Sequence, residues 1–244
     1  MISVLTITYQ RYYLLEEAIE SFIRQDPHGE SEMVVINDSS QVQYEFNHPR
    51  VRIINVPDRF PTIAAKLEYG YKQCRFDYIY RLDDDDLLAP WALANTLEDI
   101  KKNPDYEIYR SNGHYFFLNN VYHAITDNIN NGNLYTRAFL DRIVFPDKSG
   151  DEDADITFHN NAKIFNSNRE SKTMIYRWGM GTYHISGWGQ KSPDEIQHNT
   201  DTLIETIAQQ RGTQLESGTI QLIPHFQQEY YSQLPQTNTA TANK

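Results

Sequence analysis

Cysteine, positive charge and long apolar runs are all scarce in this sequence. The 244 residues include one cysteine, Cys74, which excludes a disulfide framework and a zinc site built from cysteines. No apolar stretch approaches the length that crosses a membrane. Lysine and arginine number 22 against 33 aspartates and glutamates, so the formal net charge is -11. Such a chain repels a polyphosphate backbone, which argues against nucleic-acid binding.

The first residues, MISVLTITYQ, contain no basic leader and only a short apolar run. A secretory signal peptide needs both features, so we expect a cytoplasmic protein. Hydrophobic residues make up 39% of the chain and charged residues 23%, as in a soluble globular domain. An acidic protein of this kind can still bind a small phosphate ligand if a divalent cation bridges the charges.

Strand and helix patterns alternate in the first hundred residues. Short β-branched runs predict strands, and apolar residues at helical spacing predict the helices between them. The predicted strands are 2–8, 33–36, 51–56 and 76–82, and the predicted helices are 14–23, 63–72 and one from Pro90. In the first helix Glu16 and Glu17 fall on the polar face. The alternation predicts an α/β fold with a mostly parallel central sheet flanked by helices.

The second half is less regular. Strands are predicted at 107–110, 115–118, 121–125 and 173–178, joined by turns that suggest a small antiparallel portion. Helices are predicted at 134–143, 151–162 and 193–211, and a glycine-rich segment covers 178–189. The polar end of the chain, from 235 to 244, is expected to be disordered.

Polar clusters follow three of the predicted strands, at 8–11, 37–40 and 83–86. In a parallel α/β sheet, ligands bind outside the carboxyl ends of the strands. We therefore expect these three clusters to converge in one crevice.

The third cluster is a run of four aspartates, 83 to 86. In extended backbone, alternation places Asp83 and Asp85 on one side and Asp84 and Asp86 on the other. Two carboxylates on one side suit a hard cation such as Mg²⁺ or Mn²⁺. The alternative is a solvated acidic turn in which Asp86 caps the helix that begins near Pro90.

Four segments together resemble the family 2 glycosyltransferases, which have the GT-A fold: ISVLTITYQR, VVINDSS, YRLDDDD and GDEDADI. The resemblance spans 2–155 and implies a metal-dependent, inverting enzyme of the hexosyltransferase type. Its expected donor is a nucleotide-diphosphate sugar, above all a UDP-sugar, and its acceptor a hydroxyl on a glycan, lipid-linked sugar or other molecule. It also implies a domain over 1–190, in which 1–105 binds the donor and 106–190 the acceptor. A helical extension over 191–234 and the tail 235–244 would follow.

The same resemblance assigns roles to the carboxylates. Asp83 and Asp85 match the DxD motif that holds Mn²⁺ or Mg²⁺ with the donor's diphosphate, and Asp84 lies between them in the donor site. Asp153 matches the general base, which Glu152 supports or replaces. The alternative for this acidic segment is an ordinary helix N-terminus. His184 is a further candidate metal ligand, although a lone histidine is more often structural.

The donor pocket follows from the strand ends in the same way. Asp38 matches the aspartate that contacts the nucleotide base, because a carboxylate accepts from a ring N–H. Thr8, Tyr9 and Arg11 match positions that frame the nucleotide, and Tyr9 is equally well read as a core ring. Lys66 matches a residue near the ribose or diphosphate, or else is a solvated helix lysine.

Two positions depart from the family pattern. Asn37 stands where the family often has aspartate and Ser39 where it often has glycine, which leaves the nucleotide base open. Arg177 or Lys191 is expected to meet the diphosphate. The glycine-rich segment, with Tyr183 and Trp188, is expected to close over the donor or line the acceptor site.

Two other functions fit part of the pattern. A sugar nucleotidyltransferase has a similar α/β architecture and uses a metal, but usually carries a glycine-rich basic loop after the first strand, where this chain reads TYQRYY. A non-catalytic nucleotide- or carbohydrate-binding module would keep the aspartates and lack a base directed at them. The direction of Asp153 therefore separates the module from the enzyme.

Overall fold

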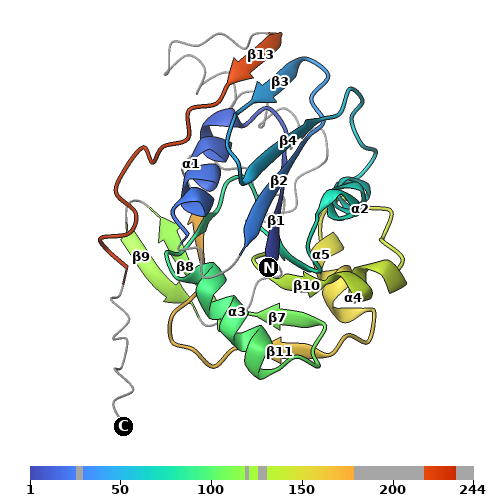
Figure 1. Ribbon diagram of the computed structural model, residues 1–244, viewed down its shortest axis with the longest axis vertical. Helices are drawn as coiled ribbons and strands as arrows, with labels where there is room; N and C mark the ends of the chain where they lie inside the picture. The colour runs from blue at the N-terminus through green and yellow to red at the C-terminus, as the bar shows by residue number, and fades with distance from the viewer. Residues whose placement is uncertain (26–29, 119–120, 126–130, 179–216, 235–244) are drawn as a thin grey trace.

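The computed structural model describes residues 1–25, 30–118, 121–125, 131–178 and 217–234 (Figure 1). They form an α/β fold around a seven-stranded sheet with the order β11-β7-β10-β5-β1-β2-β4. β10 is antiparallel to both of its neighbours, and the other pairs in this sheet are parallel. The strands are β1 (Ile2–Thr8), β2 (Ser31–Asn37), β4 (Val51–Asn55), β5 (Tyr78–Arg81), β7 (Ile108–Arg110), β10 (Leu134–Thr136) and β11 (Ile164–Asn166). The predicted mostly parallel sheet is confirmed.

Helices cover both faces of this sheet, because its central strands are apolar on both sides. Val4 belongs to a core cluster with residues of α1 (Tyr12–Ile23) and α3 (Ala92–Lys102). The next residue, Leu5, belongs to the opposite cluster, with residues of α2 (Ile63–Gln73), α4 (Arg137–Arg142) and α5 (Glu152–Phe158). This three-layer arrangement leaves the carboxyl ends of the strands free to carry polar side chains.

A second, four-stranded sheet has the order β6-β12-β8-β9. Its strands are β6 (Leu87–Leu88), β12 (Met174–Trp178), β8 (His114–Leu118) and β9 (Val121–Ile125). Two pairs are antiparallel, β12 with β6 and β8 with β9, while β12 and β8 are parallel. Because β6 follows the aspartate run directly, this sheet lies next to the candidate site and confirms the predicted antiparallel portion.

The segment 134–143 differs from the prediction of a single helix. Residues 134–136 form β10, because they pair with β5 and β7. The helix begins only after Thr136, whose hydroxyl accepts from the backbone N–H of Phe139 as an N-cap. Pairing with distant strands therefore overrides the helical periodicity at the start of the segment.

Residues 217–234, here called the C-terminal strap, run along the outside of α1. The strap begins with β13 (Gly218–Gln221), which pairs in parallel with β3 (Val42–Glu45), and continues past α1 toward β9 (Figure 1). Glu16 and Glu17 are buried, at 5% and 1% exposure. Glu16 accepts from the backbone N–H of Ile223 in the strap. The prediction that these glutamates face solvent is wrong, because the strap covers this face of α1.

The predicted boundaries at 105, 190 and 234 stay predictions. Part of the expected helical extension, 217–234, is described and contains the strand β13. The predicted helix at 193–211 and the tail from 235 lie outside the described residues. In the part of the chain that the structure describes, no helix has the length and apolar character needed to span a membrane.

Candidate active site

The three polar clusters meet at one edge of the large sheet, as predicted. β5, β1 and β2 are neighbours in that order and run in the same direction, so their carboxyl ends lie side by side. Arg11, after β1, reaches the aspartates after β5. Gln10 donates to Ser39, after β2, over 3.4 Å. The clusters therefore form one polar group of side chains at the carboxyl edge of the sheet, where ligands bind in such folds, and this edge is called the crevice below.

The four aspartates form a turn rather than an extension of β5. β5 ends at Arg81, and the backbone N–H of Asp86 donates to the carbonyl of Asp83 over 3.2 Å. This turn, residues 83–86, is called the aspartate turn below. Carboxylate oxygens of Asp83, Asp85 and Asp86 lie within 4.8 Å of one another, whereas Asp84 is directed to Arg11. The predicted alternation is wrong for Asp86, which is buried and does not cap α3.

The donor set of the aspartate turn fits a hard divalent cation. It consists of carboxylate oxygens alone, which Mg²⁺ and Mn²⁺ prefer. Burial raises the pKa of Asp83, and it raises the pKa of Asp86 well above its ordinary value, with the neighbouring Asp85 adding to the effect. Both pKa shifts indicate that ionising these carboxyl groups costs free energy at this position, and a bound cation would offset that cost.

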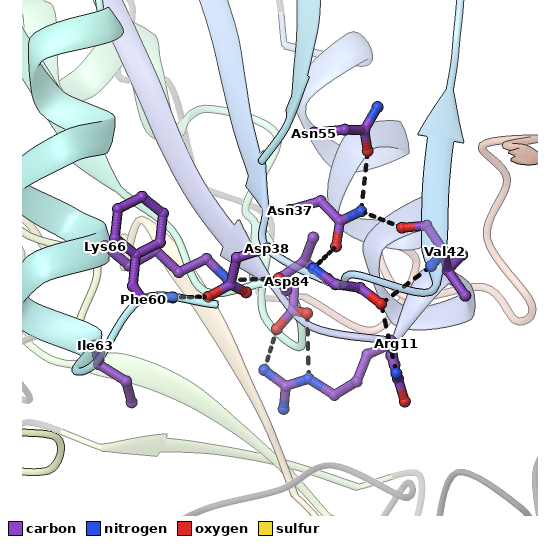
Figure 2. Close-up of polar contacts among 12 residues, drawn as sticks. Arg11, Asn37, Asp38, Val42, Asn55, Phe60, Ile63, Lys66 and Asp84 are labelled. Atoms are coloured by element: carbon purple, nitrogen blue, oxygen red, sulfur yellow. Dashed lines mark hydrogen bonds and ion pairs between the residues drawn. The ribbon is translucent and has the colours of Figure 1, made fainter. Parts of the chain in front are cut away.

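Arg11 balances part of the negative charge. Its Nε donates to Asp84 Oδ2 over 3.2 Å (Figure 2). Its Nη1 donates to Asp85 Oδ2 over 3.1 Å. Even beside this guanidinium, burial raises the pKa of Asp84 to about 6. Arg11 therefore connects the end of β1 to the aspartate turn.

Arg81 connects the aspartate turn to the acidic segment that begins α5. Its Nε lies 3.3 Å from Asp83 Oδ1, and its Nη2 donates to Glu152 Oε1 over 3.1 Å. Its Nη1 lies 3.8 Å from Asp153 Oδ2. One guanidinium thus contacts all three carboxylates. The sequence pattern did not single out Arg81, although an arginine inside a buried apolar strand, two residues before Asp83, was a usable signal.

Glu152 and Asp153 have different surroundings. Glu152 is 3% exposed, and its second carboxylate oxygen accepts from the backbone N–H of Gly150 over 2.8 Å. The side chain of Asp153 is 25% exposed. Glu152 is therefore held on both oxygens, whereas the Asp153 carboxylate is partly exposed beside Arg81.

Lys66 and Asp38 form a buried ion pair at the other end of the crevice. Lys66 also donates to the carbonyl of Thr8 over 2.6 Å, and Asp38 accepts from the backbone N–H of Phe60 over 3.0 Å (Figure 2). Burial lowers the pKa of Lys66, and the Asp38 carboxylate opposes this shift. With Lys66 at 5% exposure, the alternative of a solvated helix lysine is wrong.

The sequence model of glycosyl transferase family 2 matches residues 3–155. The chain belongs to this family. Its expected identity as a glycosyltransferase is thereby confirmed, and the sugar nucleotidyltransferase alternative loses its support.

Solved structures of similar fold place this glycosyltransferase among GT-A proteins. S. aureus TarS 1–349 in complex with UDP-GlcNAc aligns with a TM-score of 0.62 at 16% identity, covering 88% of this chain and 68% of that one. The same protein in complex with UDP gives 0.58 at 13% identity, covering 88% and 75%. A longer TarS structure gives 0.58 at 14% identity, covering 86% and 44%. At such identities the likeness shows the fold alone. No curated protein matches the chain.

Asn37, one of the departures from the family pattern, has a structural reason. Its side-chain amide donates to the carbonyl of Val42 over 2.7 Å and to Asn55 Oδ1 over 2.9 Å, and its oxygen accepts from the N–H of Ser39 over 3.2 Å (Figure 2). An ionised aspartate has no hydrogen to donate to these two acceptors. In this glycosyltransferase, Asn37 anchors β3 and β4 to the end of β2.

Tyr9 is not a core ring. The guanidinium carbon of the exposed Arg59 lies 4.1 Å from the centre of its ring, a cation–π contact at the rim of the crevice. Tyr9 is itself half-buried. The core alternative for Tyr9 is therefore wrong.

Arg177 does not face the crevice, contrary to expectation. Its side chain is fully buried and pairs with Glu17 behind the aspartate turn. The other candidates of the glycine-rich region, namely His184, Tyr183, Trp188 and Lys191, lie outside the described residues. Their roles as metal ligand, lid and diphosphate contact stay predictions.

Proposed function

We propose that this glycosyltransferase moves a sugar from a nucleotide-diphosphate sugar to an acceptor hydroxyl, with inversion and with Mn²⁺ or Mg²⁺ as cofactor. The observation that carries this proposal is the Arg81 guanidinium, which contacts Asp83 of the aspartate turn and Asp153 at the start of α5. A cation site and a partly exposed carboxylate thus adjoin one crevice. A non-catalytic module has no need for that arrangement.

The donor half supports a UDP-sugar. Asp38, which follows β2, is our candidate for the contact with a base N–H, with Thr8 and Lys66 around it. Tyr9 offers a ring face at the crevice rim for the nucleotide. TarS, which has the same fold, is described in complex with UDP and with UDP-GlcNAc. UDP-GlcNAc is therefore the first donor to test.

The aspartate turn would hold the cation through Asp83, Asp85 and Asp86, with His184 as a further candidate ligand. When bound, the ion would supply positive charge that stabilises the leaving nucleoside diphosphate. Arg11 and Asp84 would fix the floor of this site through their ion pair.

Asp153 would act as the general base. Its carboxylate takes the proton from the acceptor hydroxyl as the hydroxyl oxygen forms a bond to the anomeric carbon. The bond from that carbon to the diphosphate oxygen breaks on the opposite face, so the configuration inverts in a single displacement. Glu152, held by Arg81 and Gly150, positions α5 and supports the charge of Arg81.

The first test is the thermal stability of the full chain with UDP, GDP, CDP or TDP, each with and without Mn²⁺. A ligand that binds only the folded state raises its stability by mass action. We expect a shift with UDP that requires the metal. Asp85→Asn should abolish this shift, whereas Asp77→Asn, on a side chain 84% exposed before β5, should preserve it. Equal shifts for the parent and Asp85→Asn would contradict the metal assignment.

The second test separates the enzyme from a binding module. Asp153→Asn should keep metal-dependent UDP binding and lose sugar transfer by at least about 100-fold, the range of a lost general base. Transfer at the parent rate would remove Asp153 as the base. Binding by the parent without turnover of any UDP-sugar, with a panel of hydroxyl acceptors, would favour the module.

A further inference from the structure

A buried charged cluster lies behind the aspartate turn. It joins Arg177 on β12, Glu17 on α1 and Tyr230 in the C-terminal strap. The Arg177 and Glu17 side chains are 0% and 1% exposed, and Tyr230 is fully buried. None of the three reaches the crevice, so none can contact substrate.

Arg177 holds the aspartate turn from behind. Its backbone N–H donates to Asp86 Oδ1 over 3.0 Å, and its side-chain Nε donates to the carbonyl of Asp85 over 2.5 Å. Asn131 donates to the other oxygen of Asp86. Arg177 thus orients the carboxylate of one candidate ligand and the backbone of the next.

Glu17 and the strap hold Arg177 in turn. Arg177 Nη1 donates to Glu17 Oε2 and lies 3.3 Å from the Tyr230 hydroxyl. That hydroxyl donates to Glu17 Oε1 over 3.0 Å, and the backbone N–H of Gln227 donates to the same oxygen over 2.8 Å. Both oxygens of Glu17 are therefore occupied, and two residues of the strap contribute.

The charge of Glu17 matters for a cation site as much as its geometry. A buried arginine beside the aspartate turn lowers the local negative potential unless a carboxylate neutralises it. Without Glu17, the guanidinium of Arg177 would lack its partner and be drawn to the Asp86 carboxylate. That attraction would withdraw Asp86 from metal binding.

We propose that Glu17 and Tyr230 are positioning residues for the metal site, acting through Arg177, so that the C-terminal strap is part of the scaffold that shapes the aspartate turn. The proposal rests on the metal assignment made above and extends it to residues outside the crevice. Neither glutamate at the start of α1 nor a tyrosine near residue 230 belongs to any of the four family-like segments.

The test is a Mn²⁺ titration of the full chain without substrate, followed by the electron paramagnetic resonance signal of free Mn²⁺. Glu17→Gln keeps the size of the side chain and removes its charge. It should weaken Mn²⁺ binding by about 10- to 100-fold, as outer-shell changes do at metal sites. Tyr230→Phe should weaken it by a smaller factor, about threefold to tenfold, because the charge remains.

Tyr231→Phe is the matched control. It removes a hydroxyl from the same strap that donates to the carbonyl of Leu88 over 2.9 Å and contacts neither Arg177 nor Glu17. Its Mn²⁺ affinity should stay within about twofold of the parent, since it leaves the outer shell of the site unchanged. In steady-state assays, Glu17→Gln should raise the Mn²⁺ concentration needed for half-maximal rate and recover kcat at saturating Mn²⁺.

Three results would overturn the proposal. The first is Mn²⁺ binding by folded Glu17→Gln at the parent affinity. The second is equal weakening by Tyr230→Phe and Tyr231→Phe, which would indicate general loosening of the strap. The Tyr230 and Tyr231 pair decides the matter even if Glu17→Gln does not fold. The third is a parent that binds no Mn²⁺, which would remove the metal assignment itself and this inference with it.

Discussion

Lys66 and Asp38 form an ion pair that is almost entirely shielded from water, with side chains 7% and 4% exposed. The pair joins α2 to the end of β2, where we propose that the donor binds. Each charge is buried only because the other is present. The ion pair therefore links the stability of the domain to the shape of the proposed donor site.

Lys66→Met should destabilise the protein by about 3–5 kcal/mol, because it leaves the Asp38 carboxylate buried and unpaired. Urea unfolding followed by circular dichroism measures this loss. Lys72→Met is the control on the same helix, since Lys72 pairs with Glu68 at exposed positions and should cost less than about 1 kcal/mol. Similar losses of unfolding free energy for the two variants would show that the buried ion pair contributes no more to stability than the exposed one.

Asn37→Asp restores the residue that the family often carries, yet it should destabilise this protein. The carboxylate has no hydrogen for the Val42 carbonyl or for Asn55 Oδ1, and it faces both oxygens at close range. We expect a loss of about 1–3 kcal/mol. Asn103→Asp, at a half-buried helix end, is the comparison and should change stability far less. A neutral or stabilising Asn37→Asp would show that the amide network is dispensable.

Gly70→Ala tests how closely α2 approaches the sheet. A methyl group at this position would lie 2.7 Å from Leu5 Cδ1 and 3.1 Å from Ile36 Cγ1, both in the buried core. Overpacking of this kind costs about 1–3 kcal/mol. Helix propensity alone would give a gain of about 1 kcal/mol for alanine over glycine. The sign of the change in unfolding free energy therefore distinguishes close packing from open space.

Cys74 should be inert in the folded protein. Burial raises the pKa of its thiol to about 12, and Glu32 adds to the shift. At pH 8 only about one thiol in ten thousand would be ionised, against roughly a quarter at an ordinary thiol pKa. Modification by an aromatic disulfide reagent at pH 8 should be at least about 100-fold slower in buffer than in urea. Equal rates would mean that the thiol is accessible and ordinary.

The strands and helices that depend on local residue spacing were predicted from the sequence. β1, β2 and α2 were predicted from spacing, and the polar strand ends were expected to meet because parallel neighbours share an edge. β10 was missed since its identity depends on pairing with β5 and β7. Glu17 was assigned to solvent because the strap that covers it lies far along the chain.

The candidate site divides in the same way. The motifs and their order along the chain predicted Asp83, Asp85 and Asp153. In the structure, Asp83 and Asp85 lie in the aspartate turn and Asp153 lies beside the Arg81 guanidinium. Asp86 was grouped with Asp84, with a helix cap as the alternative, because alternation along an extended strand does not predict a turn that tertiary contacts stabilise. Arg81 carried no motif of its own, and its role depends on α5, which lies 71 residues further along.

The link between Glu17 and Tyr230 also constrains how the protein folds. These residues are 213 positions apart, so their contact closes nearly the entire chain. A contact between residues this far apart raises the contact order, and folding is slower in proteins of higher contact order. During synthesis, the first strands and helices emerge long before the strap. Arg177 can contact Tyr230 only after residue 230 has left the ribosome. The proposed metal site therefore depends on a segment that is made more than 200 residues after the helix that carries Glu17.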